Sequence, residues 1–61
     1  MPSQFAVGDI VCHIPSRAEM EVIGHDRSLV LCAWFDGDDL EELYLRECDL
    51  RLIKSAVVVA T

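Results

Sequence analysis

The chain has 61 residues, a hydrophobic fraction of 52% and a net charge of −6 at pH 7. A chain of this length forms one small domain, which leaves little room for an active site with its own supporting residues. Eleven acidic residues against five basic ones disfavour binding to nucleic-acid phosphates, which attract clustered lysine and arginine.

The rest of the composition concerns compartment and surface. The apolar fraction is somewhat high for a soluble chain, which suggests surface used on a partner or in self-association. Cys12, Cys32 and Cys48 are odd in number and widely spaced, so we expect free, mostly buried thiols in a reducing compartment. Residues 1–8 lack the basic start and long apolar segment of a signal peptide, and no apolar run reaches the roughly 20 residues of a membrane helix. A cytoplasmic protein is expected.

The first predicted strand follows a polar start. Residues 1–4 are expected to be flexible, and Phe5 is an apolar anchor ahead of a turn at residues 8–9. Residues 10–14 are rich in β-branched side chains and predict a strand. Pro15 ends it, because proline has no N–H to donate to a neighbouring strand.

Residues 18–23 predict a second strand with one solvated face. Small or apolar residues alternate with glutamates here, and side chains of a strand point alternately to its two faces. Ala18, Met20 and Val22 should therefore face the core, and Glu19 and Glu21 the solvent. Residues 24–27 are polar and predict a turn.

Residues 29–35 are all apolar and end at Asp36-Gly37. A short apolar run before a turn signal is typical of a central strand with both faces covered. We therefore expect Phe35 in the core, and Trp34 there as well.

The segment after this turn has two interpretations. Asp38 and Asp39 are good helix caps with glutamates three residues on, and Leu40, Leu43 and Tyr44 have helical spacing. A strand is equally consistent, because Leu43 and Leu45 alternate around Tyr44 and Asp-Gly favours a hairpin return. Residues 46–49 then predict a tight turn, and residues 50–53 a short strand.

Residues 54–61 form an apolar C-terminal tail. Its valines, Val57, Val58 and Val59, are strongly β-prone. The tail is predicted to be either an extra edge strand or a strand that pairs with a second copy, which would make a homodimer.

Three short patterns resemble the YodC-like family of small bacterial and phage proteins. They are Phe5-x-Val7-Gly8-Asp9-x-Val11, Met20-x-Val22 and, most specifically, Cys32-x-Trp34-Phe35-Asp36-Gly37. The resemblance covers roughly residues 5–53 and implies a small SH3-like barrel, related in shape to KOW and Tudor modules. It favours a strand for the ambiguous segment.

One loop departs from that family pattern. Residues 14–19 read Ile-Pro-Ser-Arg-Ala-Glu, where family members tend to have a Lys-Ser-Gly-Gly-Pro-like loop. Losing this basic loop weakens any nucleic-acid binding that the family would imply. The predicted architecture is all-β, a five-stranded antiparallel SH3-like barrel over residues 5–53 with a sixth strand in the tail as an option.

No residue pattern predicts catalysis, a cofactor or a metal. Structural zinc needs four Cys or His ligands, usually in close pairs, and the neighbours Cys12 and His13 point to opposite faces of a strand. His25 has no local motif that would make it the base of a cysteine nucleophile. Trp34 and Tyr44 provide only part of an aromatic cage.

We therefore predict a non-catalytic module that binds a protein partner. The contact would use an open strand edge, the apolar tail or the acidic hairpin. The expected contact residues are Asp36, Asp38, Asp39, Glu41, Glu42, Tyr44, Val57, Val58 and Val59.

Two alternatives remain open. One is a KOW-like nucleic-acid binder, whose basic residues would have to converge on one face; these are Arg17, Arg27, Arg46, Arg51 and Lys54. In the other, the acidic hairpin imitates a phosphate backbone and inhibits a basic partner.

Overall fold

The computed structural model describes residues 4–56, which form one antiparallel sheet with the strand order β4-β3-β2-β1-β5. The elements are β1 (Ile10–His13), β2 (Ala18–Asp26), β3 (Leu29–Asp36), β4 (Asp39–Arg46), the 3-10 turn η1 (Glu47–Asp49) and β5 (Leu50–Lys54). The predicted all-β fold of five antiparallel strands is confirmed, and the ambiguous segment is the strand β4. The predicted tail strand at residues 57–59 lies outside the described residues.

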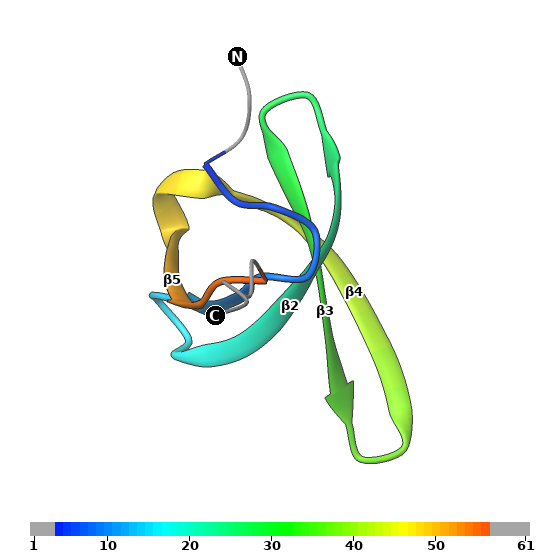
Figure 1. The fold of residues 1–61 in the computed structure, drawn as a ribbon. Helices are drawn as coiled ribbons and strands as arrows, with labels where there is room; N and C mark the ends of the chain where they lie inside the picture. The colour runs from blue at the N-terminus through cyan, green and yellow to red at the C-terminus, as the bar shows by residue number, and fades with distance from the viewer. Residues whose placement is uncertain (1–3, 57–61) are drawn as a thin grey trace, which may run out of the picture.

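The sheet is curved (Figure 1). The buried apolar side chains of its strands form one core cluster. On β2, Met20 and Val22 are buried while Glu19 and Glu21 are exposed, which confirms the predicted alternation. Each buried apolar side chain of this size contributes about 1.5–3 kcal/mol. The buried cluster is completed by Phe5, Val11, Val30, Cys32 and Leu50.

Two hairpins with two-residue loops set the register of the central strands. Asp36 pairs with Asp39 around a loop that starts at Gly37, whose φ is +66°. A positive φ at the first loop position is typical of a type II′ turn, in which glycine is favoured. Arg27 has a φ of 59° at the same position of the β2–β3 loop. The predicted turn at residues 24–27 is therefore wrong at its start, because β2 continues as far as Asp26.

Asp9 joins the two ends of the described chain. This residue is only 4% exposed. Its Oδ1 accepts a hydrogen bond from the backbone N–H of Ala56 (2.7 Å), and its Oδ2 accepts one from that of Ala6 (2.9 Å). These two bonds lower the pKa of Asp9 below its ordinary value of 3.8, because they stabilise the ionised carboxylate.

Gly8 allows the two ends to approach each other. Its φ is +99°, a conformation that side chains with a Cβ rarely adopt, and its N–H donates to the carbonyl of Val22 (2.7 Å). A Cβ at this position would lie 2.9 Å from the Cβ of Ala56. The Gly8-Asp9 pair thus fastens the N-terminal loop to the segment that follows β5.

The β3–β4 hairpin extends past the rest of the sheet. β3 pairs with β4 over its whole length, but its pairing with β2 ends at Ala33, which lies opposite Glu21. Residues 34–36 of β3 therefore have a strand neighbour on one side only among the described residues. We call residues 34–41 the hairpin tip, and Figure 1 shows it projecting beyond the curved part of the sheet.

Candidate functional site

The hairpin tip carries an exposed apolar pair. Phe35 and Leu40 lie opposite each other in the β3–β4 register, and the two residues are 73% and 55% exposed. Because opposite residues of antiparallel strands share a face, the two form one patch on the face away from the core, here called the outer face. The prediction that Phe35 lies in the core is wrong, because β2 does not pair with this part of β3.

The surface beside this pair is hollowed. The hollow has a volume of about 250 Å³, and a register shift between Val22 and Gly24 marks a β-bulge at Ile23 on its wall. Apart from one glutamate, its walls are apolar, so it can receive an apolar side chain. We call it the tip hollow; it is lined by Glu21, Ile23, Ala33, Trp34, Phe35 and Leu40.

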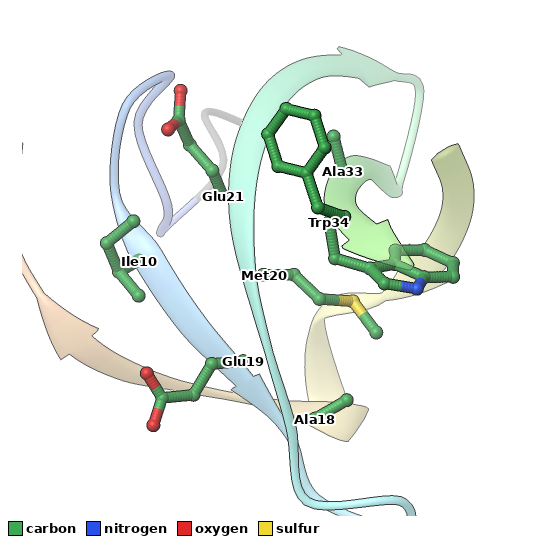
Figure 2. Close-up of a pocket in the computed structure, with 8 residues that line it drawn as sticks. Ile10, Ala18, Glu19, Met20, Glu21, Ala33 and Trp34 are labelled. Atoms are coloured by element: carbon green, nitrogen blue, oxygen red, sulfur yellow. The ribbon is translucent and has the colours of Figure 1, made fainter. Parts of the chain in front are cut away.

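A second hollow, of about 460 Å³, lies where β2 and β3 separate. Figure 2 shows Glu19 and Glu21 on the side of β2 that faces Ile10, and Met20 on the side of Trp34. Trp34 is partly buried and packs against the core, as expected. Trp34 therefore contributes to stability and is also one of the residues that line the tip hollow.

The five predicted acidic contact residues are all exposed on the hairpin; they are Asp36, Asp38, Asp39, Glu41 and Glu42. The register divides them between the two faces. Glu42 lies opposite Ala33, which in turn lies opposite Glu21, so these two glutamates share the outer face with the apolar pair. Glu41 lies opposite Trp34 on the other face. The apolar patch of the tip therefore has the carboxylates of Glu21 and Glu42 beside it on the outer face, and that of Glu41 on the other face.

Tyr44 also lies on the outer face, opposite Leu31, and is 47% exposed. This agrees with the predicted position of Tyr44 on the surface. Trp34 belongs to the opposite side of the hairpin, so these two aromatic residues do not form a shared cage. Val57, Val58 and Val59 lie outside the described residues.

The cysteines are free, with Cys12 and Cys32 buried and Cys48 exposed. Burial raises the pKa of the Cys32 thiol. A raised pKa disfavours the thiolate, which is the form that acts as a nucleophile or metal ligand.

Both histidines bond to nearby groups of the chain. The Nδ1 of His13 lies 2.7 Å from the Oγ of Ser16, in the β1–β2 turn. The Nε2 of His25 donates to the carbonyl of Phe5 at 2.7 Å, which ties β2 to the N-terminal loop. Between residues 4 and 56, no three His, Cys, Asp or Glu side chains gather closely enough to hold a metal ion.

The basic residues are spread over the sheet. Arg17 and Arg51 line a hollow of about 570 Å³. Arg27 lies in the β2–β3 loop, at the other end of β2 from Arg17. Arg46 and Lys54 are the last residues of β4 and β5.

Sequence reasoning missed the apolar part of the site and the Asp9 bonds. The exposure of Phe35 depends on where the β2 pairing ends, which residue types alone do not define. Ile23 lines the tip hollow only because of the bulge. For Asp9, the available signal was its place after Gly8 in the Val-Gly-Asp pattern.

Comparisons with protein-family models, curated proteins and solved structures gave no match. The resemblance to the YodC-like family stays a prediction. Within the described part of the chain, no helix has the length and apolar character needed to cross a membrane.

Proposed function

We propose that this protein is a non-catalytic interaction module that binds a partner protein through its hairpin tip. One observation carries the proposal: Phe35 and Leu40 are exposed side by side at the edge of an apolar hollow. Small soluble proteins rarely expose large apolar side chains together unless the patch contacts something. Aromatic anchors that fill pockets dominate the binding energy of many interfaces.

The chemistry of the tip suggests what the partner offers. The tip hollow suits one apolar side chain, and Glu21 and Glu42 lie on the same face as the exposed pair. Basic residues next to that apolar anchor would complement these carboxylates and the net charge of −6. We therefore infer a partner segment in which an apolar residue is flanked by lysine or arginine.

Two features support binding over catalysis. The thiol of Cys32 is buried with a raised pKa. The imidazoles of His13 and His25 already bond to other groups of the chain. The free thiols also support a reducing compartment, and we propose the cytoplasm.

The resemblance to KOW-like modules makes nucleic acid the main alternative partner. Arg17 and Arg27 stand at opposite ends of β2, so these basic residues are spread out and not gathered in one patch. A phosphate backbone needs several cations in line, which supports ranking a protein partner first.

The test is affinity capture from a host lysate with the tagged full-length chain. The double variant Phe35→Ser/Leu40→Ser should lose its captured protein at least about tenfold, because both anchors are removed. Val7→Ser is the matched control, since Val7 is exposed and apolar but lies outside the hairpin. Equal capture by the double variant and the wild type would contradict the proposal.

A charge variant separates this proposal from phosphate mimicry. If the hairpin only imitates a phosphate backbone, Asp38→Lys/Asp39→Lys should abolish capture and Phe35→Ser/Leu40→Ser should leave it intact. Our proposal predicts the larger loss for the apolar variant. The charge variant should mainly slow association and make it less sensitive to salt.

A further inference from the structure

We propose that two copies of the chain join edge to edge through residues 42–46 of β4, in an antiparallel register centred on Tyr44. β4 pairs with β3 on one side and forms an edge of the sheet among the described residues. Alternate residues of an edge strand present backbone N–H and C=O groups that an added strand can bond. This pairing lies beyond the hairpin tip and does not depend on the proposed partner.

This part of β4 lacks several of the features that protect the edges of sheets. Its register with β3 is unbroken, so no bulge twists it away, and the strand contains neither proline nor lysine. The carboxylates of β4 all lie at residues 39–42. Beyond them, Leu43 and Tyr44 are 48% and 47% exposed, on opposite faces of the strand.

The sequence of this segment complements itself. A two-fold axis at Tyr44 places Glu42 of each copy opposite Arg46 of the other, on the outer face. It also places Leu43 opposite Leu45 of the second copy, on the core side. Opposite charges and matched apolar residues across a strand pair are stabilising. Because of the two-fold axis, each of these contacts occurs twice, once on either side of Tyr44.

Neighbouring registers lack this match. An axis at Glu42 brings the two Glu42 carboxylates together, which is repulsive. An axis at Leu43 sets Arg46 opposite Leu40 and Glu42 opposite Tyr44, so neither charge is paired. In the Tyr44 register the strand pairing ends at Arg46, because η1 begins at the next residue.

Arg46 can make the intermolecular contact while keeping its internal one. Its Nε and Nη2 both lie 3.1 Å from the Oδ2 of Asp49. A guanidinium has five N–H donors, so further donors remain for a second carboxylate. The Arg46 side chain is 71% exposed, which leaves it accessible to Glu42 of the second copy.

The test is the mass of the full chain, measured by light scattering over a concentration series. The wild type should reach twice the 6.8 kDa of one chain. Glu42→Arg and Arg46→Glu should each raise the dissociation constant at least about tenfold, because each puts like charges opposite each other. An equimolar mixture of the two variants should recover the dimer, since the two arginines of the first variant then face the two glutamates of the second.

Glu19→Arg is the matched control, because Glu19 is an exposed acid on β2, which β3 separates from β4. It should dimerise like the wild type, and it should not rescue Arg46→Glu. Arg46→Glu also loses its bond to Asp49, so its folding is checked by circular dichroism. If Arg46→Glu unfolds, Asp49→Asn is added to it. This second substitution removes the repulsion between the introduced carboxylate and Asp49, and the double variant then serves the same test.

Three outcomes would overturn the proposal. They are a wild type that stays at the single-chain mass, a Glu42→Arg variant that dimerises as tightly as the wild type, and a mixture that fails to recover the dimer. None of these outcomes bears on capture through Phe35 and Leu40, so the two proposals fail separately.

Discussion

At the scale of single residues, Gly8 and Asp9 show how two positions fasten the ends of a small sheet. Gly8 has no Cβ that would collide with Ala56. The carboxylate of Asp9 can therefore accept a hydrogen bond from the backbone N–H of Ala56. A 61-residue domain has few such long-range bonds to spare. Both positions should therefore matter more for stability than their small side chains suggest.

Gly8→Ala should destabilise the fold more than Gly37→Ala. Both glycines have a positive φ, which costs other residues about 1–2 kcal/mol. A Cβ at Gly37 meets nothing within 4 Å, whereas one at Gly8 meets Ala56 at 2.9 Å. Urea unfolding of the two variants measures the difference. Adding Ala56→Gly to Gly8→Ala should bring its loss of unfolding free energy close to that of Gly37→Ala. If Gly8→Ala and Gly37→Ala lose equal amounts when Ala56 is unchanged, the contact with Ala56 does not matter for stability.

Asp9 should make stability depend on pH in the acid range. Its pKa is lower in the folded protein than in the unfolded chain, because its carboxylate accepts the Ala56 and Ala6 N–H groups. The contribution of the Asp9 carboxylate to the free energy of unfolding is fully present above the ordinary pKa of 3.8. It is lost as the pH falls through the pKa of Asp9 in the folded protein.

The check is a set of thermal melts of wild type and Asp9→Asn from pH 7 down to pH 2. Asp9→Asn should lower the melting temperature at pH 7 by roughly 5–10 °C, and this gap should narrow toward pH 2. Asp38→Asn, at an exposed loop position, is the control. Its melting temperature should change with pH in the same way as that of the wild type. A gap for Asp9→Asn that stays constant with pH would contradict the assignment.

At the scale of elements, the sequence predicted the strands better than their ends. Alternation identified β2, and the apolar run before Asp36-Gly37 identified β3. The segment of β4 satisfied helical and strand spacing equally, because Leu40, Leu43 and Tyr44 fit one pattern and Leu43 and Leu45 the other. Pairing with β3 decides between them, and such a long-range contact is not written in local spacing.

The two errors have related causes. Gly24 and Asp26 are residue types that are common in turns, and they suggested a turn here. In the structure they pair with Leu31 and Leu29 and extend β2. Phe35 was expected in the core because an apolar run was taken to be covered along its whole length. Its exposure follows from the point at which β2 leaves β3, which is a property of the register.

The exposure of Phe35 yields a prediction about the hairpin. Phe35→Ser should change the free energy of unfolding by no more than about 0.5 kcal/mol, as for other exposed positions. Val30→Ala, in the fully buried part of the same strand, should cost about 2 kcal/mol. Denaturant unfolding of both variants makes the comparison. Losses of similar size would place Phe35 in the core after all.

At the scale of the whole molecule, the sheet has two parts that differ in pairing and in exposure. The curved part, held by the Asp9 bonds, provides stability. The projecting hairpin provides an apolar pair, a hollow and carboxylates on both faces. The composition predicted an acidic interaction module, but which apolar residues would be exposed required the register of the strands.

The most direct measurement is capture from host lysate with the tagged wild-type chain, divided into samples with and without nuclease. Bound proteins are identified by mass spectrometry, and bound nucleic acid is sequenced. Our account predicts one protein in stoichiometric amount that remains bound after nuclease treatment. Recovery of RNA or DNA, with the associated proteins lost after nuclease, would contradict it and assign binding to the basic residues.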